Sequence, residues 1–490
     1  MTQAGVSGIS VYVPPLRVQL EQWCAWTGTP WAKIAAVVGR SFRIPAPHEN
    51  VYTMCANAVL RLIDAYGIDP QSVGYLGLGT ESSTDNCTGA VIVKGMVDEA
   101  LISQGRAPLS RYCEVPEFKQ ACLAGISALK GAVRYLACDG RGRRAIVVSA
   151  DVAEYARGST GEHTQGAGAV AMLVEEAPRL FEVDLRRAGS ASDYRVLDFR
   201  KPAARHFLDG YTSDTSRVHD FPVFNGKYST ACYLDEVVAA ADGMFRRNPD
   251  GPRYRDAYDR AAAILFHRPY HRMPQQGMAA LLVWAMARET SGHAALQTWC
   301  QAAEVSFEQV LAEIAAEPRL GALAVAEGVN VDPYVNTNKV VAAFRRSPEF
   351  ASFEHDKMRL GADKAMELGN LYTASLLAWL AAALEHAVED DVELAGRDIL
   401  AVGYGSGDAA DVIPLRLVPD WANAAKKINF TAALSGAIDL SREQYAQLHD
   451  TGVIDGLDYT PRSEFVIANV GRSYTPEFQD IGIEYYRYVP

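Results

Sequence analysis

The sequence lacks the features that mark secreted, membrane-spanning and zinc-binding proteins. Its eight cysteines form no CxxC pair, which argues against a disulfide framework or a zinc site and favours reduced thiols in a cytosol. The N-terminal residues have neither the basic start nor the apolar run of a signal peptide. The most apolar helical stretch, residues 371–384, is too short to cross a bilayer. We therefore expect a soluble cytoplasmic protein that holds no metal and does not bind a membrane.

Positive charge is also scarce. The chain has 47 Lys and Arg residues against 59 Asp and Glu residues, and its formal net charge is -12. This balance argues against a protein that binds nucleic acid, so any contacts with ligand phosphates must be local. The 490 residues, 49% hydrophobic and 22% charged, are ordinary for a globular enzyme and sufficient for a large two-part core.

Apolar runs that resemble buried strands alternate with helical segments. Residues 73–79, 145–150 and 167–174 read as strands, and an apolar-periodic helix beginning at Cys122 lies between the first two. This alternation predicts an α/β fold with active residues at strand ends. The scheme recurs later with a strand, a long helix and two more strands, at 261–266, 370 to about 388, 399–404 and 412–417.

Two similar α/β halves around one site are the predicted organisation, with residues 1–176 forming the first and 177–490 the second. Residues 178–258 are richer in charge, proline and glycine, and residues 291–354 are partly amphipathic helix. We interpret both segments as insertions in the second half. The last segment, from 465–468 through 483–488, alternates apolar and polar residues and predicts strands.

Cys122 lies at the start of the predicted helix that continues to about Leu136. Unpaired backbone N–H groups at a helix N-terminus favour a thiolate over a thiol, so this position predicts a nucleophile that is usable near neutral pH. A small, inert core cysteine is the alternative for this segment taken alone.

Two further candidates follow buried strands. Glu81 comes directly after the strand at 73–79, where partial desolvation would raise its pKa toward that of a general base; the alternative is a solvated loop acid. His267 follows the strand at 261–266 and could polarise or protonate a substrate carbonyl; the alternative is a structural imidazole. His267 and His271 have the spacing of a helical zinc pair, but Pro269 between them argues against it.

A glycine-rich loop and an asparagine complete the candidates. Gly405-Ser406-Gly407 follows a strand and could direct backbone N–H groups at an oxyanion, or it could be a simple tight turn. Asn370 begins the predicted long helix, where it would be an N-cap or would present its amide to a substrate.

Taken together, these runs resemble the 3-hydroxy-3-methylglutaryl-CoA (HMG-CoA) synthase family of the thiolase superfamily. Each run is weak alone, but their common order along the chain is specific. The matching runs are Thr80-Glu81-Ser82, Gln120-Ala121-Cys122, Ser149-Ala150-Asp151 with Tyr155, Thr164 to Val170, Asp198 to Pro202, Phe221 to Val223 with Gly226 to Ser229, Phe266 to Tyr270, Gly369 to Thr373, and Tyr404 to Gly407.

The resemblance implies a thiolase-like fold, in which two α/β halves pack in αβαβα layers, and a homodimer. It implies an acyltransferase that condenses acetyl-CoA with acetoacetyl-CoA to HMG-CoA for the mevalonate pathway, with CoA thioesters as substrates and no cofactor. In the family, the residue matching Cys122 carries the acetyl group and the one matching Glu81 removes a methyl proton. The residue matching His267 positions the acceptor and helps supply a proton to the new alkoxide.

The resemblance also implies a set of substrate-binding positions. Backbone N–H groups of Cys122 and Ser406 would hold the thioester oxygen. Arg272 is a candidate contact for a CoA phosphate, with a solvated surface arginine as the alternative. The remaining polar positions around the substrate are Asn370, Tyr155, Asp151, Asp198, Tyr372 and Gly405.

Three features leave the acceptor open. Phe118-Lys119-Gln120-Ala121-Cys122 resembles the branch that works in polyketide assembly, where a β-ketoacyl chain is carried by an acyl carrier protein. The run from Thr164 to Val170 resembles bacterial mevalonate-pathway members, and the segment 87–109 is longer than usual. A catalytically silent scaffold that binds thioesters is an alternative of another class, and the presence of Glu81, Cys122 and His267 counts against it.

Overall fold

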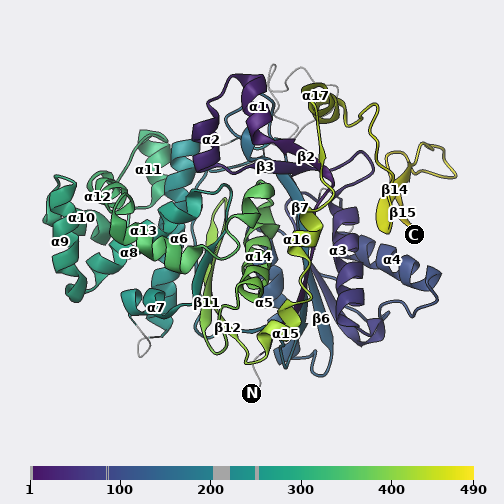
Figure 1. Ribbon diagram of the computed structural model, residues 1–490, viewed down its shortest axis with the longest axis horizontal. Coiled ribbons are helices and arrows are strands. Elements are labelled where there is room, and N and C mark those ends of the chain that lie inside the picture. The colour runs from purple at the N-terminus through teal and green to yellow at the C-terminus, as the bar shows by residue number, and fades with distance from the viewer. Residues whose placement is uncertain (1–3, 84, 87, 202–220, 224, 249–252) are drawn as a thin grey trace.

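The computed structural model describes residues 4–83, 85, 86, 88–201, 221–223, 225–248 and 253–490. Its centre is a ten-stranded mixed sheet (Figure 1). The strands follow one another in the order β10 (Ala263–Phe266), β11 (Asp398–Gly405), β12 (Ala409–Leu417), β8 (Phe181–Val183), β1 (Gly5–Tyr12), β7 (Gly166–Glu175), β6 (Arg144–Ala153), β4 (Val73–Gly79) and β5 (Glu117–Phe118), and β9 (Gly189–Ser192) pairs with β12. All the strands predicted in the two halves are therefore confirmed.

Two buried helices lie between the two arms of this sheet. Figure 1 shows α5 (Ala124–Ala137) and α14 (Ser375–Glu389) between β11 and β12 on one side and β6 and β7 on the other. Almost every residue of α14 is buried, because a helix enclosed by two sheet arms has no face for solvent. Lys130 of α5 pairs with Asp411 of β12 at 2.7 Å, which ties the first half of the chain to the second.

Helices cover the outer faces of both arms. On the first arm, α3 (Val51–Tyr66) packs on β1, β6 and β7, and α4 (Gly89–Ser103) packs on α3 and β4. On the second arm, α6 (Gly226–Arg247) packs on β9 and β12, and α8 (Met273–Arg288) packs on α6 and β10, with α7 (Tyr254–Arg260) beside it. The helix, sheet, helix, sheet, helix arrangement confirms the expected layers.

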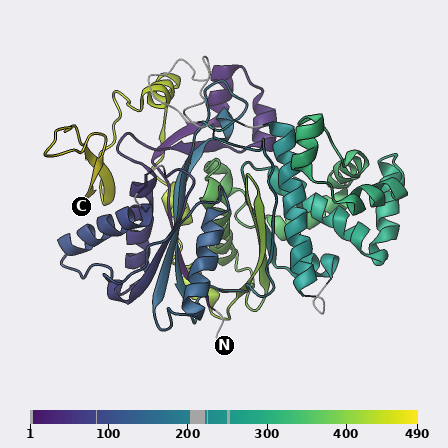
Figure 2. The same cartoon turned by 180° about the vertical axis from the view of Figure 1, so that it is seen from behind.

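The segment from 291 to 354 is entirely peripheral. Figure 2 shows its green helices at one flank, opposite the blue helix α4. They are α9 (His293–Ala302), α10 (Phe307–Ala316), α11 (Leu320–Glu327), α12 (Val335–Arg345) and α13 (Pro348–Met358). Helices α9, α10 and α12 pack on α8, and α13 contacts strand β10 directly. The interpretation of this segment as an insertion stays a prediction.

The remaining elements cover the end of the molecule above the sheet and its far flank. The small sheet there consists of β2 (Leu16–Gln19), β3 (Ser41–Ile44) and β13 (Ile438–Asp439), with α1 (Leu20–Thr27), α2 (Trp31–Val37) and α17 (Arg442–Thr451) close by. The strands expected at the end of the chain are confirmed as the hairpin of β14 (Glu464–Val470) and β15 (Glu484–Val489). Short helices α15 (Trp421–Ala425) and α16 (Phe430–Leu434) pack against α14.

Two predictions about elements are wrong. Residues 178–258 are not an insertion in their described part, because β8 joins the two arms of the sheet and α6 covers one of them. Residues 202–220 and 249–252 of that segment lie outside the described residues. The long helix does not begin at Asn370, since a 3-10 turn at Tyr372–Ala374 comes first and α14 begins at Ser375. Within the described chain, no helix is both long and apolar enough to cross a membrane.

Candidate active site

Cys122 lies in a sharp turn between β5 and α5. Ala121 has a φ of 45°, in the left-handed region that non-glycine residues rarely adopt, and the side chain of Cys122 is nearly buried. The turn is held from the other half of the chain by Gly405, where an added Cβ would lie 2.4 Å from the carbonyl oxygen of Gln120. The glycine loop and the cysteine turn therefore pack directly against each other.

Glu81 lies beside the cysteine. Cys122 Sγ donates to Glu81 Oε2 at 3.7 Å, and Glu81 comes from the end of β4, as predicted from its place after the strand. Burial, and secondarily the charge of Asp151, raise the pKa of the Glu81 carboxyl to about 8. A carboxyl with that pKa can accept and return a proton near neutral pH.

The prediction that the helix terminus makes Cys122 a thiolate is wrong for the protein without substrate. Burial, and then the charge of Glu81, raise the pKa of the Cys122 thiol well above its usual range. Cys122 precedes the first residue of α5 by two positions, and the partial charge of a helix terminus does not offset full burial next to a carboxylate. The resting form is a thiol with a base in contact.

Asp151 is the centre of the hydrogen-bond network behind Glu81. It is fully buried on β6 and accepts from the backbone N–H groups of Glu81 and Ser82 at 2.8 and 2.9 Å. Thr80 Oγ1 and Ser82 Oγ donate to it at 2.8 Å, and Thr373 donates through its N–H and Oγ1 at 3.0 and 2.6 Å. The expectation that Asp151 contacts substrate is wrong, because protein donors occupy both its oxygens.

Three aromatic rings surround Cys122. Tyr155, Phe199 and Tyr372 pack edge to face with ring centroids 5.9–6.4 Å apart, and Cys122 belongs to the same buried cluster. Burial raises the pKa of both tyrosines, so both hydroxyls stay protonated as donors. Tyr155 and Tyr372 were expected here, whereas Phe199 was missed although its neighbour Asp198 was named.

His267 faces the same cavity from the end of β10. Its ring stacks on Tyr404 at a centroid distance of 6.3 Å, and its backbone carbonyl accepts from the Tyr233 hydroxyl at 3.2 Å. Burial lowers the pKa of the imidazole to about 3. A neutral imidazole can donate one hydrogen bond, so His267 is suited to polarise a substrate carbonyl. Its part in supplying a proton to the alkoxide stays a prediction.

One cavity of about 310 Å³ brings the candidates together. Cys122, Tyr155, His267, Asn370, Tyr372 and Ser406 all line it, and Glu81 joins this wall through its contact with Cys122. Asn370 Oδ1 accepts from the Tyr372 N–H at 2.9 Å and from Ser375 Oγ at 3.0 Å, so its amide nitrogen is the atom left for the cavity.

Comparison with known proteins places this geometry in a family. The family model of the hydroxymethylglutaryl-coenzyme A synthase N-terminal region matches residues 1–178, and that of the C-terminal region matches residues 351–451, together more than half of the chain. The chain belongs to the HMG-CoA synthase family.

Individual relatives agree with this assignment. The hydroxymethylglutaryl-CoA synthase of Haloferax volcanii is 27% identical over 96% of this chain and 98% of its own. The structure of MvaS in complex with 3-hydroxy-3-methylglutaryl coenzyme A has a TM-score of 0.76 at 24% identity, and covers both chains fully. The HMG synthase of the curacin biosynthetic pathway, in complex with acetyl donor-ACP, has a TM-score of 0.70 at 20% identity and covers 99% of this chain and 100% of its own. These structures establish the thiolase-like fold.

Four substrate contacts expected for this HMG-CoA synthase family member do not line the cavity: Asp151, Asp198, Gly405 and Arg272. Asp198 is fully buried and accepts from the Tyr404 hydroxyl at 2.9 Å, so it acts behind a residue of the cavity wall. Arg272 is not a lining residue of the cavity.

A possible metal site needs separate consideration. Oxygen and sulfur atoms of Asp198, Cys232 and Asp408 lie close together, but the Arg195 guanidinium lies 3.5 Å from Asp408 and already places a cation there. We assign no metal to them.

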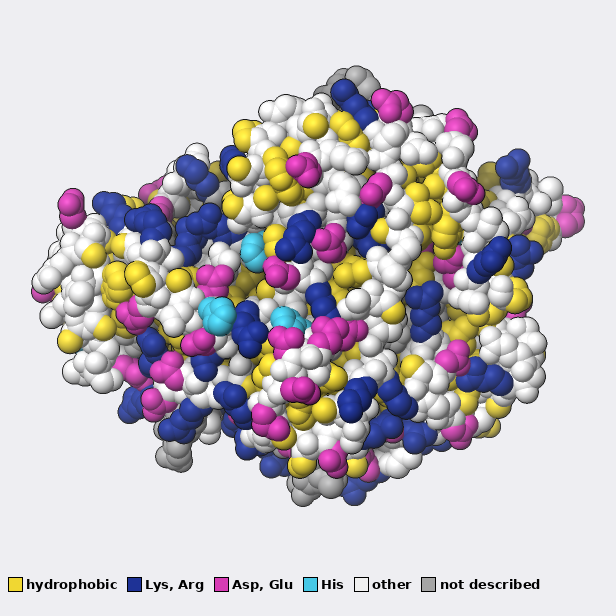
Figure 3. Space-filling view, viewed as in Figure 1, with side chains coloured by type: hydrophobic (Ala, Val, Ile, Leu, Met, Phe, Trp, Pro, Cys, Tyr) yellow, Lys and Arg dark blue, Asp and Glu magenta, His cyan; other side chains and the backbone are white. Residues whose placement is uncertain are grey.

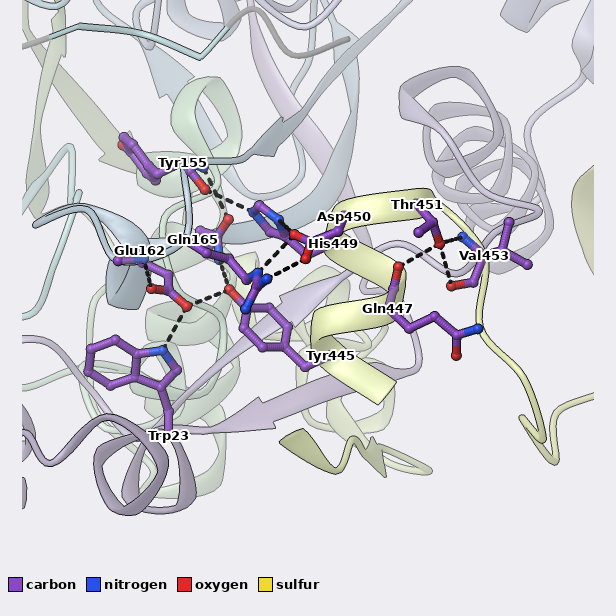
Figure 4. Close-up of polar contacts among 12 residues, drawn as sticks. Trp23, Tyr155, Glu162, Gln165, Tyr445, Gln447, His449, Asp450, Thr451 and Val453 are labelled. Carbon is purple, nitrogen blue, oxygen red and sulfur yellow. Dashed lines mark hydrogen bonds and ion pairs between the residues drawn. The ribbon is translucent and has the colours of Figure 1, made fainter. Parts of the chain in front are cut away.

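A polar network from the end of the family's C-terminal region holds Tyr155, and no local sequence pattern predicts this network. Figure 4 shows Tyr445 and His449 of α17 pointing toward the segment that carries Tyr155, Glu162 and Gln165. His449 Nε2 contacts the Tyr155 carbonyl at 2.9 Å, and the Tyr445 hydroxyl donates to Glu162 at 2.9 Å. Gln165 Nε2 donates to the Tyr445 hydroxyl at 2.8 Å, and Gln165 Oε1 accepts from the Tyr155 N–H at 3.0 Å. Both backbone groups of Tyr155 are therefore fixed from outside the cavity.

Proposed function

We propose that the protein is a hydroxymethylglutaryl-CoA synthase that condenses acetyl-CoA with acetoacetyl-CoA through an acetyl-Cys122 intermediate. The observation that carries the proposal is the contact of the Cys122 thiol with Glu81 at the wall of a cavity that His267 and Asn370 also line. Membership in the HMG-CoA synthase family supports it.

The first half-reaction is acyl transfer. Cys122 Sγ attacks the thioester carbonyl of acetyl-CoA while Glu81, in its carboxylate form, accepts the thiol proton. The carbon–sulfur bond to CoA breaks, and the CoA thiolate takes the proton from Glu81, so CoA leaves as a thiol and Glu81 returns to its carboxylate form. Backbone N–H groups of Cys122 and of Ser406 would hold the developing oxyanion, which the close packing of Gly405 on the cysteine turn supports.

The second half-reaction forms a carbon–carbon bond. Glu81 removes a methyl proton from acetyl-Cys122, and the carbanion adds to the ketone carbon of the acceptor, whose oxygen becomes an alkoxide. His267 polarises that ketone as a neutral donor, and protonated Glu81 returns its proton to the alkoxide. Water then cleaves the bond to Cys122, which releases the HMG product and restores the thiol.

The carrier of the acceptor is assigned to CoA. Relatives named hydroxymethylglutaryl-CoA synthase match nearly the full length of the chain, which supports CoA as the carrier. Figure 3 shows basic side chains interspersed with acidic ones over the visible face, which is the distribution expected when phosphate contacts are local.

Intact-protein mass spectrometry tests the proposal. Acetyl-CoA should add one acetyl group to the wild type and none to Cys122→Ser, and acetoacetyl-CoA should then discharge the adduct as HMG-CoA. Cys113→Ser, which changes a half-buried cysteine outside the cavity, is the matched control and should behave as the wild type. Turnover without an adduct would overturn the covalent route. Discharge only by a carrier-bound β-ketoacyl chain would move the enzyme to the polyketide branch.

The wider setting is also part of the proposal. We place the enzyme in a reducing cytoplasm, because all seven cysteines within the described chain are free, and we assign HMG-CoA to isoprenoid synthesis through mevalonate.

We further propose a homodimer. It would bury the sheet edge at β5, the last strand of the sheet, near which Tyr112 is 90% exposed. Sedimentation of the wild type and of Tyr112→Asp would test that interface.

A further inference from the structure

A buried acidic cluster lies behind the cavity wall formed by Tyr404. Asp198 and Asp408 are 0% and 7% exposed, and neither lines the cavity. Carboxylate oxygens of both residues and the Cys232 sulfur lie within 4.8 Å of one another. Asp408 directly follows the Gly405-Ser406-Gly407 loop, in which Gly405 packs on Gln120 and Leu123 of the turn that carries Cys122.

The charges in this cluster do not balance if every carboxyl is ionised. Arg195 is the cation at its centre, and its Nη2 is already bound to Asp235 and Glu236 at 2.6 Å each. Its Nε lies 3.5 Å from Asp408 Oδ2, beyond a strong hydrogen bond. Within the described residues, neither Asp198 Oδ1 nor Asp408 Oδ2 has a hydrogen-bond donor. Two adjacent carboxyl groups in such a site are expected to share one proton.

We propose that Asp408 is a positioning residue, which as a neutral carboxylic acid donates to Asp198 and thereby holds Tyr404 and the Ser406 loop in the geometry needed for acetylation of Cys122. The inference rests on the proposed function. Asp198 accepts the Tyr404 hydroxyl at 2.9 Å on its other oxygen, so the proton on Asp408 satisfies the oxygen that lacks a donor. Tyr404 in turn stacks on His267.

Burial, followed by the charge of Asp198, raises the pKa of Asp408 to about 9. The backbone also anchors this residue, because Asp408 N and O exchange hydrogen bonds with Asp193 O and N at 3.0 and 3.3 Å. The titratable and charged groups around the pair are Cys232, Tyr404, Tyr228, Arg195, Asp193, Asp235 and Glu236. The pKa values of Cys232, Tyr404 and Tyr228 are all raised, so these groups stay neutral. The surrounding acids outnumber the single arginine, and this excess of negative charge favours retention of the proton shared by Asp198 and Asp408.

Loss of that proton would place two negative charges beside each other and push Asp408 and its loop away from Asp198. The Ser406 N–H would then lose its alignment with the thioester oxygen, and acetylation would slow. The wild type should therefore lose acetylation rate above about pH 9, by about tenfold for each further pH unit. Asn at position 408 keeps a donor to Asp198 and cannot ionise.

The experiment compares initial rates of Cys122 acetylation by acetyl-CoA in the wild type, Asp408→Asn and Asp408→Ala from about pH 7 to about pH 10, by rapid quench and intact mass. We expect Asp408→Asn to match the wild type near neutral pH and to lack the alkaline decline. Asp408→Ala should be slower by about tenfold at neutral pH, with an unchanged KM for acetyl-CoA.

Each result decides the question. An alkaline decline of the same midpoint in Asp408→Asn, or full activity in Asp408→Ala, overturns the inference and leaves the proposed function intact. An inactive Asp408→Asn also overturns it, because a donor at that position should suffice. If Asp408→Ala does not fold, the Asn profile decides alone. Absence of acetylation in the wild type at every pH would instead be a failure of the proposed function.

Discussion

The two walls of the cavity are built on different physical principles. The wall from the first half of the chain holds groups that exchange protons: Glu81 and Cys122 are in contact, and the pKa of each is raised by burial. The wall from the second half presents neutral dipoles, among them the imidazole of His267 and the amide of Asn370. One half therefore moves protons and the other orients carbonyl groups, and the experiments below test that division in order of expected effect.

Removal of the base should have the largest effect. Glu81→Ala should lower condensation by roughly a hundredfold to ten-thousandfold, the range for a positioned general base, because Glu81 is the carboxyl group in contact with the Cys122 sulfur. Acetylation should remain possible, since water can accept a thiol proton but cannot replace a positioned base for a methyl proton. Single-turnover assays started from acetyl-CoA and from preformed acetyl-enzyme would separate the two steps.

Glu81→Gln is the matched control for this change. It keeps the packing and the contact to Cys122, so an equal loss in both variants assigns the effect to proton transfer. Normal condensation in either variant would show that another residue is the base.

The pH dependence of condensation should follow Glu81. Its pKa is raised from 4.5 to about 8, so the ionised form is scarce at low pH and predominates only above about pH 8. The rate of condensation from preformed acetyl-enzyme should therefore rise about tenfold for each pH unit below that value and then level off. If the rate of condensation already reached its plateau at about pH 5, the Glu81 carboxyl would titrate as it does in water, and the prediction would be wrong.

Substitution on the orienting wall should separate binding from chemistry. His267→Ala should leave the rate of Cys122 acetylation within about twofold and raise the KM for acetoacetyl-CoA by about tenfold, the cost of a substrate hydrogen bond. Because burial holds the pKa of His267 near 3, this KM in the wild type should stay constant between about pH 5 and 8. A KM that changes across pH 6.5 would show that the imidazole titrates and would contradict the division of roles.

The sequence located both walls, and the reason lies in local patterns. Glu81 and His267 stand directly after buried strands, and the end of a strand is where a side chain can face a cavity. The sequence did not reveal the protonation states, because these depend on burial and on neighbours from distant segments, such as the effect of Glu81 on Cys122. The same limit applies to Asp151, because the donor to its second oxygen is Thr373, which lies 222 positions later in the chain.

The start of the long helix was misplaced for a related reason. An asparagine after glycine is typical of an N-cap, and Asn370 does accept a backbone N–H, but from a 3-10 turn that precedes α14. Phe199 and Tyr404 belong to recognised runs, yet apolar and aromatic residues in a run do not reveal which cavity their rings will line. The support from α17 has no local signature, since His449 reaches a backbone carbonyl almost 300 positions earlier.

The contacts of α17 with the Tyr155 segment give the smallest expected effect and the sharpest test of how the two walls are joined. His449→Ala removes the contact to the buried Tyr155 carbonyl and should lower the free energy of unfolding by about 1–3 kcal/mol. Tyr155 keeps its N–H bond to Gln165, so acetylation should slow only about fivefold, with the KM for acetoacetyl-CoA unchanged. His449→Gln, which can still donate, should recover both quantities in part. The contrary outcome is a higher KM for acetoacetyl-CoA without slower acetylation. It would mean that the ring of Tyr155 contributes to binding of the acceptor and not to acetylation of Cys122, so that α17 would support the orienting wall.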